Sequence, residues 1–168
     1  SIISIGSFDG VHLAHQTIFD KMNALKKQKN SKNIVITFDP SPKSVLQNKN
    51  VQKKYLLTQL EDKINLIKNS AIDVLFIISF TKKTALITAD IFLDKIIKCF
   101  SPIHFVMGHN HRFGYKRKGD IDFVRLYSKK RFKVHLIKEQ IILNKESISS
   151  TKIRNYLSKG KINKANIL

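Results

Sequence analysis

The stretch that decides the fold is Ser4-Ile5-Gly6-Ser7-Phe8-Asp9-Gly10-Val11-His12-Leu13-Ala14-His15, near the start of the 168-residue chain. An apolar strand over Ile2–Ile5 runs into a glycine turn, and two histidines, His12 and His15, then open a helix at spacing i, i+3. Glycines let the backbone approach a ligand closely, and a helix start offers unpaired N–H groups to phosphate. Both imidazoles share one helix face and can point at the same anion. The pattern indicates a nucleotide site.

Short apolar runs alternate with helical patterns along the rest of the chain. This rhythm predicts one α/β domain with a Rossmann-like, doubly wound and mostly parallel sheet. Loops that follow the strands, at residues 6–10, 39–42 and 108–119, are expected to converge on one edge. The further expected strands cover residues 34–38, 74–78, 104–107 and 133–136, the helices cover 14–28, 58–68, 88–98, 120–130 and 150–160, and a hairpin (140–143 with 146–148) and a helical tail (162–168) complete the chain.

Two local features sharpen these expectations. Thr58 followed by Glu61 predicts a capping box at the start of the second helix. Cys99 is the single cysteine and lies in an apolar helical stretch, so we expect a buried structural thiol. With no internal disulfide possible, the reducing cytoplasm is the expected setting, and no apolar run is long enough to predict a membrane span.

The formal net charge of +19, from 31 Lys and Arg against 12 Asp and Glu, raises the possibility of nucleic-acid binding. The basic residues are scattered, and no basic stripe with interleaved aromatics appears. Lys, Asn and Ile dominate throughout, which favours a compositional origin. The charge also attracts a phosphorylated small molecule.

The opening histidines have three interpretations. A metal site lacks a third ligand at usable spacing, and a single helical histidine is usually a packing residue. Two on one face directly after a glycine turn favour phosphate contact, where they would stabilise charge on departing pyrophosphate. The three-glycine dinucleotide pattern and the P-loop lysine motif are both absent, which argues against a dehydrogenase and a P-loop kinase.

Four stretches, in order, resemble a known family. Gly6 to Gln16 resembles the signature of the HxGH nucleotidyltransferases, and specifically the FMN adenylyltransferase domain of bacterial bifunctional riboflavin kinase/FAD synthetases. Thr37-Phe38-Asp39-Pro40-Ser41-Pro42 resembles that family's strand-end loop, Gly108-His109-Asn110-His111-Arg112-Phe113-Gly114 its flavin-side loop, and Ser149-Ser150-Thr151-Lys152-Ile153-Arg154 its final helix start. The resemblance implies that residues 1–168 form this domain and that a C-terminal riboflavin kinase domain, absent from this chain, is covalently linked in the full-length protein.

The resemblance also implies a reaction: AMP passes from ATP to FMN, forming FAD and releasing pyrophosphate. The attacking FMN phosphate is already an anion, so no general base is required, and catalysis depends on positioning and charge neutralisation with Mg2+ bridging the phosphates. The candidate catalytic residues are His12, His15, Ser150, Thr151 and Arg154. The candidate ATP site adds Gly6, Ser7, Phe8, Asp9 and Gly10 to these five, and the candidate FMN site comprises Phe38, Pro40, Ser41, Pro42, Asn110, Arg112 and Phe113.

The residues support these roles independently. Ser150 and Thr151 lie where an N-cap hydroxyl and the first free N–H groups gather, and Arg154, one turn on, can reach the same anion as a bidentate donor. The alternative is that they simply cap a helix. Asp9 is expected to hold its turn rather than to bind a metal.

Three positions depart from the family pattern. Ala14 replaces the usual glycine, and its methyl group is expected to crowd the nucleotide and weaken its binding. Ser41 stands where histidine is usual, which removes an expected flavin or phosphate contact, and His111 stands where Phe or Tyr is common.

Two other functions remain open from the sequence. One is a nucleotidyltransferase of the same fold that acts on another phosphorylated small molecule, such as a pantetheine, nicotinamide or glycerol phosphate. The other is a degenerate or nucleic-acid-binding basic domain.

Overall fold

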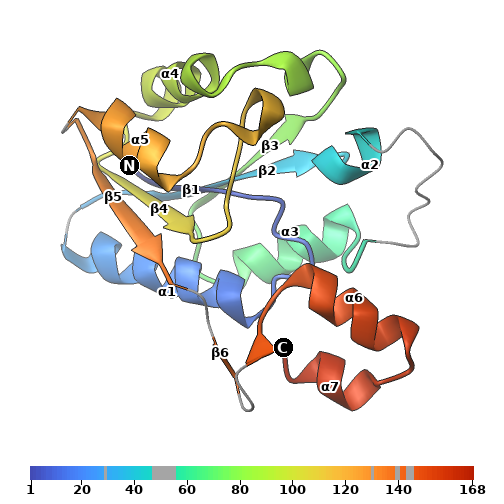
Figure 1. Cartoon of the computed structure of the whole chain (residues 1–168). Helices are drawn as coiled ribbons and strands as arrows, with labels where there is room; N and C mark the ends of the chain where they lie inside the picture. Colours follow the sequence, from blue (N-terminus) through green and yellow to red (C-terminus); the bar gives the residue numbers. More distant parts are fainter. Residues whose placement is uncertain (29, 47–55, 130, 139–140, 143–145) are drawn as a thin grey trace.

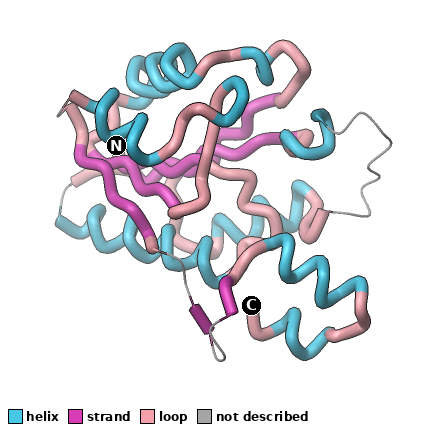
Figure 2. The backbone as a smooth tube through the Cα atoms, viewed as in Figure 1, coloured by secondary structure: helices cyan, strands magenta, loops and turns pink. Residues whose placement is uncertain are grey.

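A five-stranded, all-parallel sheet forms the centre of the computed structural model, which describes residues 1–28, 30–46, 56–129, 131–138, 141–142 and 146–168. From β1 the chain builds outward to β2 and β3, then crosses to β4 and β5 on the other side (Figures 1 and 2). The switch point therefore lies between β1 and β4, and the predicted doubly wound sheet is confirmed. The sheet order is β3-β2-β1-β4-β5, with β1 at Ile2–Ile5, β2 at Asn33–Asp39, β3 at Val74–Ser79, β4 at His104–Gly108 and β5 at Lys133–Ile137.

Helices cover both faces of the sheet. α1 (Leu13–Gln28) and α3 (Leu60–Lys68) lie on one face, and α4 (Ala89–Phe100) and α5 (Ile121–Ser128) on the other (Figure 1). β1 is buried throughout and β2 along almost all its length, as expected for apolar strands covered on both sides. The edge strand β3 differs, because Phe76 there is 44% exposed.

Three short elements were not expected from the sequence. They are α2 (Pro42–Leu46) after β2, and single 3-10 turns at η2 (Thr84–Leu86) and η3 (Tyr115–Arg117). All three follow strands, so they shape the loops at the carboxyl edge of the sheet.

The predicted capping box is wrong. α3 begins at Leu60 with Gln59 as its N-cap, and no side chain caps it. The Thr58 hydroxyl instead accepts a hydrogen bond from the Gly10 N–H at 3.2 Å, which ties α3 to the loop after β1. The Thr58 hydroxyl, which the local pattern assigned to the start of α3, is thus used in a contact between segments distant in sequence.

The predicted burial of Cys99 is also wrong, because its thiol lies on the exposed side of α4. The buried face of this helix is made by Ala89, Leu93 and Ile96 at spacing i, i+4, i+7. Cys99 falls outside that stripe despite its apolar neighbours in sequence.

A helical hairpin, α6 (Ser150–Ser158) and α7 (Ile162–Asn166), packs beside the start of α1 (Figure 1). Ala14 and Ile153 pack against its small apolar cluster, and the Leu13 N–H donates to the Leu168 carbonyl at 2.8 Å. The predicted hairpin appears as β6 (Ile141–Ile142) paired with β7 (Glu146–Ser147), while its turn at 144–145 lies outside the described residues. No helix in the described parts of the chain is both long and apolar enough to cross a bilayer.

Candidate functional site

A cavity of about 290 Å³ lies at the switch point, and we call it the polar cavity because many serine, threonine, histidine and other polar residues line it. Its walls come from the loop after β1, the first turn of α1, the loop after β4 and the start of α6. The structure thus joins segments that are up to about 140 residues apart in sequence. Of the candidate ATP residues, Gly6, Ser7, Phe8, Asp9, His12, His15, Ser150 and Thr151 line this cavity, whereas Gly10 and Arg154 do not.

The His12 and His15 rings stack on one another, with centroids 3.7 Å apart and planes at 14°. The Phe8 ring packs edge-on against His15 at 5.1 Å and fixes its orientation. The Nδ1 atoms of both histidines are buried without a hydrogen-bond partner among the described residues. Buried polar atoms of this kind call for a ligand or water.

Both imidazoles are neutral at pH 7. Burial lowers the pKa of His12 to about 4, and burial together with His12 and His111 lowers the pKa of His15 well below its usual value. A neutral imidazole still donates one N–H. The pair can therefore hydrogen-bond phosphate oxygens without itself carrying charge.

The loop before these histidines has an unusual backbone. Phe8 and Val11 have φ of +45° and +39°, in the region that bulky residues rarely occupy, and Gly10 has φ of +83°. A Cβ on Gly10 would also lie 2.7 Å from Leu57 Cδ1. Gly10 thus permits the close approach of Leu57, just before α3. Gly10 therefore faces Leu57 and is not part of the cavity wall.

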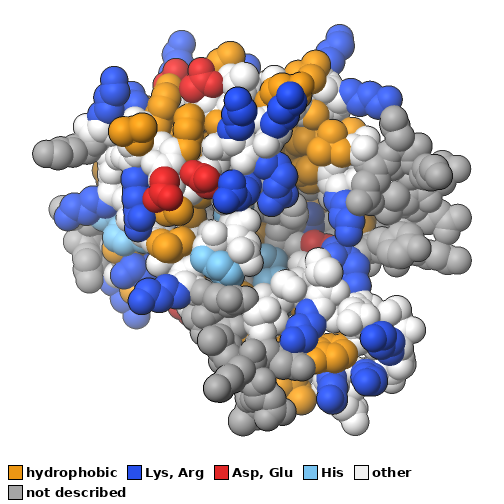
Figure 3. All heavy atoms as spheres, in the orientation of Figure 1, with side chains coloured by type: hydrophobic (Ala, Val, Ile, Leu, Met, Phe, Trp, Pro, Cys, Tyr) orange, Lys and Arg blue, Asp and Glu red, His pale blue; other side chains and the backbone are white. Residues whose placement is uncertain are grey.

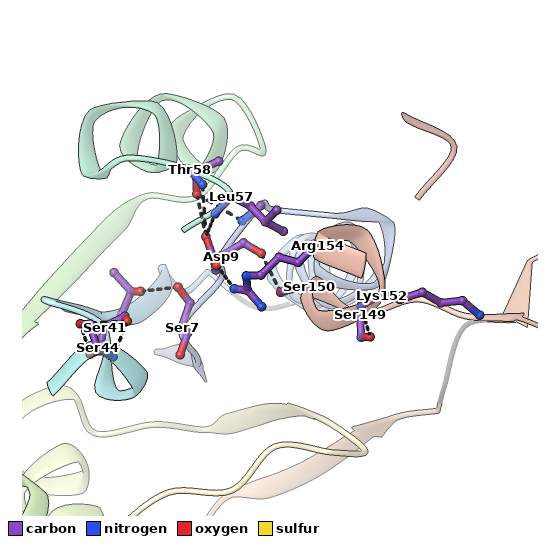
Figure 4. Close-up of polar contacts among 12 residues, drawn as sticks. Ser7, Asp9, Ser41, Ser44, Leu57, Thr58, Ser149, Ser150, Lys152 and Arg154 are labelled. Atoms are coloured by element: carbon purple, nitrogen blue, oxygen red, sulfur yellow. Dashed lines mark hydrogen bonds and ion pairs between the residues drawn. The ribbon is translucent and has the colours of Figure 1, made fainter. Parts of the chain in front are cut away.

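Asp9 links three segments of the site (Figure 4). Its Oδ1 accepts hydrogen bonds from the backbone N–H groups of Leu57 and Thr58 at 2.9 and 3.2 Å, and its Oδ2 forms an ion pair with the Arg154 guanidinium. Its carbonyl accepts a hydrogen bond from the Ser150 hydroxyl at 2.8 Å. Asp9 therefore has a structural role, as expected, but it joins the loop to α3 and α6 rather than closing only its own turn.

The N-cap of α6 is Ser149, one residue earlier than expected. Its side chain accepts from the Lys152 N–H at 3.3 Å. Ser150 and Thr151 are then the first two helical residues, whose N–H groups have no intrahelical acceptor. Since both residues line the polar cavity, the positive end of α6 faces it.

A second and larger cavity, of about 970 Å³ and mainly apolar, opens beside the first. The two share Gly6, Ser7, Asn110 and His111 in their walls. The aromatic part of the large cavity is a row of rings in the order Phe80, Phe38, Phe92 and Phe113, and the centroids of neighbouring rings in this row lie 5.5 to 6.4 Å apart.

The candidate FMN residues are only partly brought together. Phe38, Pro42, Asn110, Arg112 and Phe113 line the large cavity, whereas Pro40 and Ser41 do not. Ser41 is buried, and its hydroxyl accepts from the Ser44 N–H at 3.2 Å at the start of α2. Arg112 is half-exposed and pairs with Asp120 at 3.2 Å.

Sequence reasoning missed several parts of this wall. Phe80 directly follows β3, so its place at a strand end was a usable signal. Phe92 and Ile87 reach the cavity through the packing of α4 and the segment before it, which no local pattern reports. Lys63, buried on α3, was missed as well.

The buried histidines make stability depend on pH. Burial lowers the pKa of His111, like that of His12, to about 4. Between the ordinary value of about 6.5 and this depressed value, the unfolded chain binds protons that the folded chain does not, so acid favours unfolding. We expect the free energy of unfolding to fall by about 2 kcal/mol per histidine from pH 7 to pH 5.

Urea unfolding at the two pH values checks this expectation. His111→Asn removes one of the buried histidines with a lowered pKa and should flatten the pH dependence. Equal stability of the unaltered chain at pH 7 and pH 5 would contradict it.

The chain resembles known proteins over nearly all its length. It is 33% identical to the bifunctional riboflavin kinase/FMN adenylyltransferase of Listeria monocytogenes over 99% of this chain and 52% of that protein. It is 37% identical to the protein of the same name from Buchnera aphidicola subsp. Schizaphis graminum, over 96% of this chain and 52% of the relative. The chain thus spans about half the length of the curated relatives it matches.

A crystal structure described as a macrolide-efflux protein from Streptococcus pneumoniae superimposes with a TM-score of 0.80 at 25% identity, covering 93% of this chain and 50% of that one. The family model for FAD synthetase matches residues 1–152, a range that includes both cavities and the first three residues of α6. With the four sequence stretches gathered around one switch point, the match settles the assignment: the chain belongs to the FAD synthetase family.

Proposed function

We propose that this chain transfers AMP from ATP to FMN, forming FAD and pyrophosphate. The observation that carries the proposal is the pair of cavities that meet at Gly6, Ser7, Asn110 and His111. One is polar and faces a helix N-terminus, as a triphosphate needs, and the other is wide and aromatic, as a flat tricyclic ring needs. Their junction is where the two phosphates would meet.

In this reaction an oxygen of the FMN phosphate attacks the α-phosphorus of ATP. A new P–O bond forms while the bond to the α–β bridging oxygen breaks, and that electron pair leaves with pyrophosphate. His12 and His15 would donate hydrogen bonds to oxygens of the departing group, and the first N–H groups of α6, at Ser150 and Thr151, would hold the same anion. No side chain needs to act as a base, because the nucleophile is already an anion.

Mg2+ enters this proposal as part of the substrate MgATP. Within the described residues no group of three His, Cys, Asp or Glu side chains is placed to hold a metal ion. Phosphate oxygens are good Mg2+ ligands, so the ion can be carried by the nucleotide and neutralise its charge. The chain's own residues then position the phosphates around it.

For FMN, the ring would enter between the aromatic walls, and Asn110, at the junction, would contact it or the phosphate through its amide. Half-exposed Arg112 and the neighbouring Lys116 and Arg117 line the same cavity and favour an anionic ligand. Figure 3 shows Lys and Arg scattered over the viewed face rather than gathered in a stripe, which gives nucleic-acid binding no favoured surface there.

The direct test is incubation with ATP, MgCl2 and FMN, followed by chromatography for FAD and an assay for pyrophosphate. Parallel reactions replace FMN by 4′-phosphopantetheine, nicotinamide mononucleotide or glycerol 3-phosphate. Product only with one of these would transfer the proposal to that acceptor. No turnover with any acceptor, together with steep salt-dependent DNA binding, would replace it by a nucleic-acid-binding role.

A covalently linked riboflavin kinase domain and a cytoplasmic location are further parts of this proposal. The two relatives named above carry riboflavin kinase in their names, and a kinase domain covalently linked to this one would supply FMN directly. A reducing cytoplasm suits the single, exposed Cys99.

Ala14 gives a test of nucleotide binding. Its methyl group lines the polar cavity and also packs against the cluster of the C-terminal hairpin. We expect Ala14→Gly to tighten ATP binding by relieving crowding, and to lower the free energy of unfolding by about 1 kcal/mol through the lost contact and weaker helix propensity. Calorimetric titration with ATP and thermal unfolding measure the two effects, and unchanged or weaker binding would show that the methyl group does not crowd the nucleotide.

A further inference from the structure

The groups assigned so far to the polar cavity bring little positive charge to it. A triphosphate carries several negative charges, and even MgATP keeps a net negative charge that the protein must offset. Among the described residues that line the polar cavity, Lys138 is the only lysine or arginine. Lys138 has no part in the mechanism proposed above.

The other basic groups near this cavity do not fill the need. Burial lowers the pKa of His12 and of His111 to about 4, and burial above all lowers the pKa of His15 well below its usual value, so these three rings are neutral at pH 7. Arg154 is not part of the cavity wall, and its guanidinium pairs with the Asp9 carboxylate (Figure 4). The start of α6 adds only the partial charge of a helix end.

The fold places Lys138 at the carboxyl edge of the sheet. In the register of β4 with β5, Ile137 lies opposite Gly108, and Lys138 is the first residue after β5. The His109 N–H donates a hydrogen bond to the Ile137 carbonyl at 3.1 Å, which keeps the segments after these two strands side by side. The parallel strands thus bring Lys138 to the edge at which the polar cavity lies.

Lys138 belongs to the part of the polar cavity that is not shared with the large one. The shared wall is made by Gly6, Ser7, Asn110 and His111, whereas Lys138 lines the polar cavity alone. Lys138 is exposed and forms no ion pair with another described residue. An ammonium on a long, flexible stem can therefore turn toward an arriving phosphate without breaking an ion pair.

We propose that Lys138 is a phosphate-binding residue: its ammonium contacts the β- and γ-phosphates of ATP in the polar cavity and supplies a full positive charge there. This end of the triphosphate is the one within its reach, because the α-phosphate must lie at the junction with the large cavity, where the FMN phosphate would attack it. The inference rests on the proposed function for its ligand. Its measurable consequence, affinity for ATP and pyrophosphate, does not require turnover, so failure of the two proposals can be told apart.

The test compares Lys138→Met with Lys133→Met in the whole chain, by calorimetric titration with MgATP, pyrophosphate and adenosine and by FAD formation. Lys133 is also exposed but lines neither cavity, so its replacement removes the same charge at the opposite end of β5. Lys138→Met should weaken the binding of MgATP and pyrophosphate by about tenfold, near the lower limit for a hydrogen bond to a charged group because the ammonium is exposed to water. It should leave adenosine binding unchanged, and Lys133→Met should leave the binding of all three ligands unchanged.

Three further measurements separate a phosphate contact from a structural role. The difference in MgATP affinity between the unaltered chain and Lys138→Met should shrink as NaCl is raised from about 50 to about 500 mM, because salt screens an exposed charge. Lys138→Arg keeps the positive charge and should retain most of the affinity. Thermal unfolding should show that Lys138→Met is as stable as the unaltered chain, because the exposed side chain forms no ion pair with the described residues.

Unchanged affinity for MgATP and pyrophosphate in Lys138→Met would overturn the proposal. So would an equal loss in Lys133→Met, which would assign the effect to the net charge of the whole chain, or an equal loss for adenosine, which would place Lys138 at the nucleoside. Absence of FAD from the unaltered chain, with ATP binding still dependent on Lys138, would instead overturn FMN adenylylation alone.

Discussion

Replacing His12 or His15 by alanine is expected to lower kcat for FAD formation by about 10²- to 10³-fold, the range for loss of a preorganised donor to developing negative charge. Both histidines line the polar cavity, and the Nδ1 atom of each is buried without a hydrogen-bond partner among the described residues. Because the stacked rings are already neutral and already oriented by Phe8, little reorganisation is needed when pyrophosphate departs. Steady-state assays with saturating ATP and FMN measure the effect.

The fold should survive these changes, since the sheet and its two apolar layers do not depend on either imidazole. His135→Ala serves as the matched control, because His135 lies on β5 outside both cavities. It should retain kcat within a fewfold of the unaltered chain. Turnover that is unchanged in both His12→Ala and His15→Ala would remove the pair from the catalytic machinery.

The fold was largely predictable because its signals are local. Each central strand is an apolar run covered on both faces, and each helix carries an apolar stripe, so type and order can be derived from neighbouring residues. Convergence of the loops at residues 6–10, 39–42 and 108–119 also follows, since the carboxyl ends of parallel strands share one edge. The structure confirms it in the walls of the large cavity.

The failures share a different cause. The Thr58 hydroxyl binds the Gly10 N–H because two segments distant in sequence meet there. Cys99 is exposed because the rotation of α4 about its axis places it outside the buried face. The burial of Lys63 is of the same kind: α3 is amphipathic, and only its docking on Asp9 shows that a lysine faces inward. Sequence patterns indicate which residues share one face of a helix, but not which other part of the chain packs against that face.

Arg154 was predicted to bind the nucleotide phosphates, but it does not line the polar cavity, and the structure shows a different contact for its guanidinium. Its guanidinium pairs with Asp9, whose side chain is 7% exposed, and so fastens α6 to the loop after β1. Arg154→Met leaves this buried carboxylate with hydrogen bonds but without a counter-charge. We expect the free energy of unfolding to fall by about 3 kcal/mol and the melting temperature by roughly 6–12 °C.

A second substitution separates the two tasks of Arg154. Asp9→Asn keeps an oxygen for the Leu57 and Thr58 N–H groups but removes the charge, so Arg154→Met/Asp9→Asn should regain most of the lost stability. Its rate of FAD formation should stay low, because the bidentate donor proposed for the phosphates is still missing. Arg154→Lys is the matched control: it keeps the positive charge near Asp9 but not the planar fork, and should therefore retain more stability than rate. Recovery of both stability and rate in the double variant would restrict Arg154 to fastening the loop, and would leave His12, His15 and the first turn of α6 as the groups that bind the phosphates.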